Sequence, residues 1–194
     1  MLLATRFGFP VSTTHALVGA LTGAGLAAAP QEVQLARLWD TFGKPLMLSP
    51  LVAVGSGILV LGVPKLCHLA PKHRTKTLDV LHFLSGGAVS FARGLNDTPK
   101  IAALLLVAPA IGVPTSLVAV GLAMAMGGWL HAQKVALTMS RKITGMNPGE
   151  GLAAQVASAV LVTTASIHGL PVSTTHVSVG CLTGIGVLTG QAHW

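Results

Sequence analysis

The chain has 194 residues, of which 52% are hydrophobic and only 9% are charged, and its formal net charge is +7. Ordinary soluble domains carry about 25% charged residues, so this composition excludes a typical cytosolic enzyme and a disordered tail, and two cysteines exclude a disulfide-rich module. With a mean hydropathy of +0.72 and 23 glycines in apolar surroundings, the chain is predicted to be an all-α integral membrane protein.

Five apolar stretches are each long enough to cross or enter a bilayer, whose core needs about 20 helical residues. In chain order they lie near residues 10–29, 45–63, 79–108, 110–128 and 151–190. The last is too long for one crossing and contains Gly169-Leu170-Pro171, which predicts two half-length arms joined by a turn, a re-entrant hairpin. The third is interrupted by residues 93–100 (Arg-Gly-Leu-Asn-Asp-Thr-Pro-Lys), which predicts a broken transmembrane helix.

Basic residues gather in the loops between these stretches rather than on a polar face, which argues against binding to nucleic acid. One loop, residues 64–78, contains Lys65, His68, Lys72, His73, Arg74 and Lys76, and another contains His131, Lys134, Arg141 and Lys142. Two crossings separate the basic loops, so the positive-inside rule predicts both on the cytoplasmic side of the cell membrane. The nearly neutral loop at residues 31–44 is then predicted outside.

An eight-residue motif occurs twice. Residues 8–15 (Gly-Phe-Pro-Val-Ser-Thr-Thr-His) return at an offset of 161 as residues 169–176 (Gly-Leu-Pro-Val-Ser-Thr-Thr-His), and the match continues downstream in both copies. Three predicted crossings separate the copies, and because this number is odd, the copies enter the membrane from opposite sides. The pattern predicts an inverted-topology repeat, which is typical of secondary transporters with a site near the bilayer midplane.

Each copy places three hydroxyl side chains where the second hairpin arm begins: Ser12, Thr13 and Thr14, and Ser173, Thr174 and Thr175. The free backbone N–H groups and the positive dipole end of a helix, together with hydroxyl donors, suit a tetrahedral oxyanion. Alternatively, these side chains only cap the helices and bond to carbonyls within them. His15 and His176 could carry protons or bind anions, but we prefer to interpret them as packed, hydrogen-bonded spacers.

Asp97 is an acidic residue at membrane depth, next to Asn96, and a carboxylate there usually marks an ion pathway or a paired site. Carboxylate and carbonyl oxygens suit a hard cation such as sodium. The alternative is a structural ion pair of Asp97 with Arg93 or Lys100, which lies three residues further on. An intramembrane hydrolase is disfavoured, because nothing pairs a serine with a histidine as nucleophile and base.

The two Pro-Val-Ser-Thr-Thr-His motifs, Gly94-Leu95-Asn96-Asp97 and residues 133–144 resemble the inorganic phosphate transporter (PiT) family over nearly the whole chain. The resemblance implies a symporter that moves phosphate inward with sodium or protons. Carried over by position, Ser12, Thr13, Thr14, Ser173, Thr174 and Thr175 would line the phosphate site. Asn96 and Asp97 would line the cation site, with sodium at Asp97, and no other metal and no cofactor is expected.

The chain departs from the family pattern in three ways. The family's first Asn-Asp helix break would lie upstream of Met1, and its final span would lie beyond Trp194, so we expect the chain to be incomplete at both ends. The usual Gly-Ala-Asn-Asp-Val-Ala-Asn reads Gly94-Leu-Asn-Asp-Thr-Pro-Lys100 here. We hypothesise that the Lys100 ammonium neutralises Asp97 and replaces one coupling cation.

The sequence as a whole therefore predicts an all-α membrane protein built from inverted repeats, with two re-entrant helical hairpins and a broken transmembrane helix. Residues 1–63 would end the first repeat, residues 64–78 would form a cytoplasmic loop, and residues 79–194 would form the second repeat. The predicted function is cation-coupled phosphate transport across the cell membrane by alternating access, and not an enzymatic activity. The alternatives are a sulfate permease, or a non-transporting part that needs a partner. The expected partners are lipid and a homodimer copy or a complementing transporter half.

Overall fold

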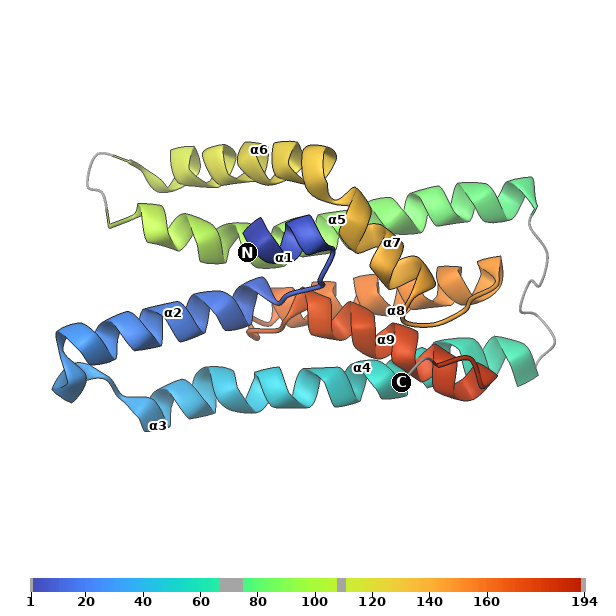
Figure 1. Cartoon of the computed structure of the whole chain (residues 1–194), viewed down its shortest axis with the longest axis horizontal. Helices are drawn as coiled ribbons and strands as arrows, with labels where there is room; N and C mark the ends of the chain where they lie inside the picture. The colour runs from blue at the N-terminus through green and yellow to red at the C-terminus, as the bar shows by residue number, and fades with distance from the viewer. Residues whose placement is uncertain (1, 67–74, 108–110, 193–194) are drawn as a thin grey trace.

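The computed structural model describes residues 2–66, 75–107 and 111–192, and every regular element in these ranges is helical (Figure 1). The helices of the first part are α1 (Leu2–Phe7), α2 (Thr13–Ala28), η1 (Pro30–Glu32), α3 (Leu35–Leu38), η2 (Trp39–Gly43) and α4 (Lys44–Leu66). Those of the second part are α5 (Lys76–Leu105), α6 (Val113–His131), α7 (Gln133–Arg141), α8 (Pro148–Ile167) and α9 (Thr174–Thr189). The all-α prediction is confirmed for the described residues.

Within the described ranges, three helical segments are long and apolar enough to cross a membrane, namely Leu35–Val63, Val113–His131 and Pro148–Ile167. The third of these is α8, which has 20 residues and is about 30 Å long at 1.5 Å per residue. It is therefore longer than the half-length hairpin arm that we predicted. A capping box explains the extension: the Asn147 side chain accepts from the Glu150 N–H and the Glu150 carboxylate accepts from the Asn147 N–H, so the helix begins before the apolar stretch does.

The prediction of a broken third helix is wrong. Helix α5 runs through residues 93–100 without interruption, with Pro99 inside it. Its buried residues include Leu78, Ser85, Ala92 and Asn96, whose spacing of seven, seven and four places them along one face. This face packs on α8, so tertiary packing holds the helix together where the local sequence disfavours it.

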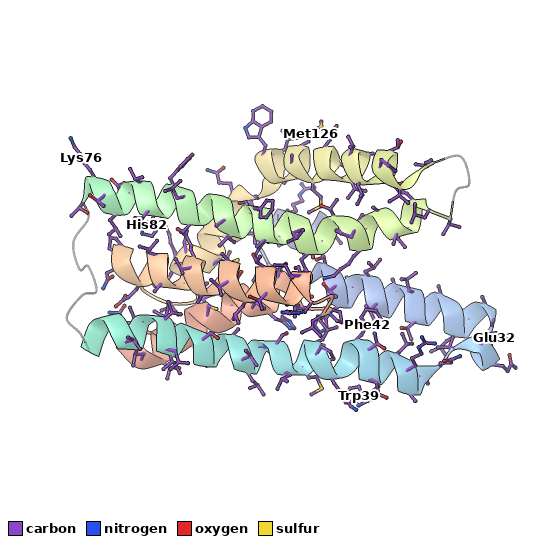
Figure 2. The ribbon with its side chains drawn as sticks, turned by 180° about the vertical axis from the view of Figure 1, so that it is seen from behind. Glu32, Trp39, Phe42, Lys76, His82 and Met126 are labelled. Atoms are coloured by element: carbon purple, nitrogen blue, oxygen red, sulfur yellow. The ribbon has the colours of Figure 1, made fainter. Side chains whose placement is uncertain are left out.

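Helices α8 and α9 lie between α4 and α5 (Figure 1), where α8 packs mainly on α5 and α9 packs mainly on α4. Small side chains, including Ala53, Ala92 and Ala157, contribute to the buried core between them, which allows the backbones to approach closely. Polar bonds join α5 to α8 as well. Figure 2 shows His82 of α5, whose Nε2 lies 2.6 Å from the backbone oxygen of Pro148, and Ser85 donates a hydrogen bond to Gln155.

The predicted basic loop between α4 and α5 falls mostly outside the described residues. Lys65 belongs to the last turn of α4 and Lys76 begins α5, whereas His68, Lys72, His73 and Arg74 lie outside the described ranges. The loop's predicted side of the membrane stays a prediction.

The predicted turn between the last two apolar arms is confirmed, and the first copy of the motif has the same turn. Gly8 and Gly169 both adopt a positive φ, at 78° and 66°. The N–H of the next residue then bonds back to the preceding arm, from Phe9 to the Ala4 oxygen and from Leu170 to the Ala165 oxygen, at 2.8 Å each. Helices α2 and α9 follow these turns, begin near the middle of the molecule and run to opposite ends of it (Figure 1).

Candidate anion and cation site at the hairpin tips

The two serines of the repeated motif cap the two helices that follow them. The Ser12 Oγ accepts a hydrogen bond from the His15 N–H, and the Ser173 Oγ accepts one from the His176 N–H, each at 3.1 Å. Serine suits this position because its side chain satisfies one of the free donors of the first helical turn. Both serines are buried, so their hydroxyls are engaged in starting α2 and α9.

The two tips also bind each other through repeat-equivalent residues. The Thr14 hydroxyl donates to the Val172 oxygen at 3.1 Å, and the Thr175 hydroxyl donates to the Val11 oxygen at 3.2 Å. Position 14 corresponds to 175 and position 11 to 172, so the same bond is made twice in opposite directions. The rings of the equivalent His15 and His176 lie against each other between the tips, with centroids 4.5 Å apart.

Asn96 and Asp97 of α5 contact this junction and are almost completely buried, with 5% and 6% of their surfaces exposed. The Asn96 Nδ2 donates to the Val172 oxygen at 3.1 Å and to the Asp97 Oδ1 at 3.2 Å. The Thr174 hydroxyl donates to the Asp97 Oδ2 at 3.2 Å. Hydrogen-bond donors therefore reach both oxygens of the Asp97 side chain.

Lys100 brings a positive charge into the same cluster. Its Nζ donates to the Thr14 Oγ1 and to the Val172 oxygen, both at 3.0 Å, and lies 3.7 Å from the Asp97 Oδ1. A hydroxyl, a carbonyl and a carboxylate oxygen thus converge on one cationic group, which is the type of oxygen set that a hard metal cation prefers. The ion pair of Lys100 with Asp97, which was the alternative to a cation site, is present.

A small cavity of about 130 Å³ opens between the tips and α5. Its polar lining includes Thr13, Thr174, Thr175, Arg93 and Asp97. A neighbouring cavity of about 280 Å³ is lined by Thr13, Thr14, Asp97 and Lys100 together with apolar residues of α2 and α5. A larger cavity, between α2 and η2, is mostly apolar and contains none of the predicted site residues.

Arg93 is the site residue that sequence reasoning missed, since it was considered only as an ion-pair partner of Asp97. Its Nη2 instead donates to the Ser178 hydroxyl of α9 at 3.2 Å, and its buried Nε–H has no hydrogen-bond partner among the described atoms. The planar guanidinium, with several donors in a fixed fork, matches an oxyanion such as phosphate. The available signal was an arginine within an apolar stretch, one helical turn before Asp97.

The structure therefore brings all the predicted site residues into one cluster but gives them different tasks. Ser12 and Ser173 cap the helices, Thr14 and Thr175 tie the tips together, and Asn96 holds a tip carbonyl. Of the hydroxyl groups, those of Thr13 and Thr174 stand at the first residues of α2 and α9 and border the small cavity that Arg93 also lines. This cavity offers hydroxyl donors, a guanidinium and two helix N-termini to an anion.

Comparisons with known proteins identify a family and its relatives. The profile of the phosphate transporter family matches residues 1–78 and 67–194. The chain is 35% identical to a protein of Rhizobium meliloti (strain 1021) named "Probable low-affinity inorganic phosphate transporter", over 93% of this chain and 57% of that protein.

Two further relatives are a sodium-dependent phosphate transporter 1-A of Danio rerio and the sulfate permease CysP of Bacillus subtilis (strain 168). The first is 36% identical over 57% of this chain and 19% of its own length, and the second is 27% identical over 95% of this chain and 52% of its own length. The chain spans less than three fifths of the length of the Rhizobium relative. No solved structure matches the chain. The relatives are transporters and permeases rather than enzymes, and the chain belongs to the phosphate transporter family.

Proposed function

We propose that this chain forms the phosphate- and cation-binding part of a cation-coupled phosphate transporter in the cell membrane. The observation that carries the proposal is the meeting of two repeat-equivalent hairpin tips around a cavity lined by Thr13, Thr174 and Arg93. The names of the relatives support phosphate as the substrate.

The anion would bind between the two tips. The Thr13 hydroxyl and the Arg93 guanidinium would donate hydrogen bonds to its oxygens, and the Thr174 hydroxyl would turn from the Asp97 carboxylate to the anion. The positive dipole ends of α2 and α9 would add favourable partial charge from two directions. Such donors act strongly because the surrounding helices keep the local dielectric low. A tetrahedral oxyanion fits this geometry because its oxygens can meet donors on several sides at once.

The balance of charges favours phosphate over sulfate. Arg93 and Lys100 together carry two positive charges, against the single negative charge of Asp97. The monoanion of phosphate would neutralise this cluster, whereas sulfate, a dianion at neutral pH, would leave an excess negative charge at membrane depth. The relation to a sulfate permease keeps sulfate as the second candidate, and a cation that enters with the anion would be needed for it.

The same cluster supports cation coupling. The dianion of phosphate, like sulfate, would exceed the net positive charge of the cluster by one, so its binding would be linked to the binding of a coupling cation. Sodium or a proton could supply this charge as cargo in a transport cycle. In this chain the Lys100 ammonium lies among the oxygens of Thr14, Val172 and Asp97, so we propose that it replaces one coupling cation.

The arrangement of the helices supports an inverted repeat with alternating access. Helices α2 and α9 start at the shared site and run to opposite ends of the molecule (Figure 1), as two re-entrant arms entering from opposite sides would. Residues 1–63 and 79–194 would be parts of the two repeats, joined by the cytoplasmic loop at residues 64–78. Since the two tips exchange hydrogen bonds, each repeat could move against the other about this junction.

The experiment is phosphate binding to the whole chain in lipid nanodiscs, followed by uptake into vesicles with sulfate as competitor and with sodium or a proton gradient as the driving force. Thr174→Ala and Arg93→Gln should each weaken phosphate binding about 10- to 100-fold, because each removes a donor worth about 1.5–3 kcal/mol to a charged ligand. Thr189→Ala is the matched control, since Thr189 lies at the far end of α9 and bonds only to the Gly186 oxygen in the described structure.

Unchanged phosphate affinity in both site variants would place the anion elsewhere. Stronger competition by sulfate than by phosphate would favour the sulfate alternative. Phosphate binding without uptake would mean that the chain holds the site but needs a partner to transport.

A further inference from the structure

Two helices that follow equivalent turns carry the same pair of glycines but differ in what covers them. Gly180 and Gly184 of α9 correspond to Gly19 and Gly23 of α2 at the repeat offset. A Cβ atom at Gly180 would lie 2.7 Å from the Ala53 side chain, and one at Gly184 would lie 3.0 Å from the carbonyl carbon of Val54. A Cβ atom at either glycine of α2 would meet nothing within 4 Å.

The covered face of α9 shows what this pair of glycines is for. Helix α4 packs directly against it, so that the backbones approach where no side chain intervenes. Small residues at such spacing serve close helix pairing in membranes, where the backbones can touch only if Cβ atoms are absent. The glycine pair of α9 is therefore a packing site for a membrane helix, and α4 packs there.

The equivalent face of α2 is bare in the described structure. Thr14, at the start of α2, is the one buried residue of that helix, whereas most residues of α9 are buried. Leu21, next to the glycines, is 53% exposed, and the equivalent Leu182 is 8% exposed. The difference lies in the neighbours of the two helices, because the preceding turns, the N-caps and the cross-tip bonds of α2 and α9 correspond.

We infer that the Gly19/Gly23 face of α2 is the docking site for an apolar membrane helix of the same kind as α4, supplied from outside residues 1–194. A second copy of this chain is a poor occupant, because the matching stripe of its own α4, around Pro50, Ala53 and Val54, is already filled by α9. The Rhizobium relative has ample further sequence, since this chain spans only 57% of it. The inference concerns assembly and does not depend on which anion is transported.

The test uses a synthetic peptide of residues 44–66 as the α4-like probe, labelled with an acceptor dye and added to the whole chain in lipid vesicles. Energy transfer from the chain's tryptophans reports binding, because the peptide has none. We expect saturable binding that a scrambled peptide lacks, and a loss of affinity of at least about tenfold in the double variant Gly19→Leu/Gly23→Leu. The matched control is Gly121→Leu/Gly127→Leu, which fills equally open space on α6.

Three results would overturn the inference. The scrambled peptide could bind as well as the native sequence, or binding could survive the Gly19→Leu/Gly23→Leu change, which would place the peptide elsewhere, for example on α9. Alternatively, the unmodified chain could self-associate in vesicles and lose this association in the double variant, which would make a second copy the occupant. Phosphate binding measured in the same variants separates this outcome from a failure of the proposed function.

Discussion

The backbone oxygen of Val172 holds the centre of the site, because it accepts hydrogen bonds from Thr14, Asn96 and Lys100. These donors come from the other hairpin and from α5, so one carbonyl joins the three elements that surround the cavity. Because Val172 precedes the N-cap residue of α9, its carbonyl is not needed for a hydrogen bond within that helix and can accept bonds from other elements. Its position follows from the capping of α9 by Ser173, which turns the preceding residues out of the helix.

Replacing Lys100 by asparagine should make phosphate uptake more dependent on sodium. The change removes a fixed positive charge from among three oxygen atoms, which a sodium ion could then share. We expect uptake by the unmodified chain, in whatever assembly proves active, to change less than about twofold when choline replaces sodium. The Lys100→Asn variant should lose most of its uptake under the same exchange.

Lys134→Asn is the control for this prediction, since the Lys134 ammonium is exposed and bonds to the Arg6 oxygen away from the cluster. Equal sodium dependence of the Lys100→Asn variant and the unmodified chain would show that the ammonium does not substitute for a coupling cation.

The sequence alone predicted which residues form the cluster, but not the separate structural role of each residue in it. The repeated Pro-Val-Ser-Thr-Thr-His motif and Asn96-Asp97 are unusual enough in apolar surroundings to be recognised, and the structure places them in one cluster. The distinction between a capping serine, a tip-joining threonine and a cavity-lining threonine depends on side-chain direction at the meeting of two hairpins. Arg93 was missed for the same reason, because its proximity to the tips requires the packing of α5 against α9.

At the scale of elements, the contact between α4 and α9 should tolerate no side chain at its centre. Gly184→Leu would drive a side chain into the backbone of α4 near Val54, and overpacking of this kind costs about 1–3 kcal/mol or more. The thermal unfolding midpoint, followed by tryptophan fluorescence in detergent, should fall by several degrees. Gly23→Leu makes the same change at the repeat-equivalent position, where space is open, and should leave the midpoint nearly unchanged. Equal effects of the two substitutions would mean that the α4–α9 contact is looser than described.

The elements also show where sequence reasoning is reliable. The turn at Gly169 was predictable, because glycine and proline act locally and the positive φ at that glycine is a local requirement. The continuity of α5 was not, because Pro99 and the polar residues near it argue for a break when read alone. The face that packs on α8 outweighs that local preference, and such long-range packing leaves no short sequence signature.

At the scale of the whole molecule, the two hairpins should behave as one coupled unit. Thr14→Val and Thr175→Val each remove a hydrogen bond across the tips while nearly preserving volume, and each should destabilise the chain by about 0.5–1.5 kcal/mol. Thr14→Val should have the larger effect, because the Thr14 hydroxyl also accepts from the Lys100 ammonium. Since both bonds close the same junction, loss of one loosens the geometry of the other. The double variant should therefore depart from additivity by about 0.5–1 kcal/mol.

The measurement for this coupling is a double-mutant cycle of unfolding free energies in detergent, with a second cycle that pairs Thr14→Val with Thr189→Val as its reference. Thr189 bonds within its own helix at the far end of α9, so that pair should be additive. If the Thr14/Thr175 pair were additive as well, the tips would be neighbours without being joined. The two cross-tip hydrogen bonds of Thr14 and Thr175 would then not couple the two halves of the molecule energetically. A coupled junction, in contrast, gives a binding event at the cavity a direct mechanical connection to both hairpins, which alternating access requires.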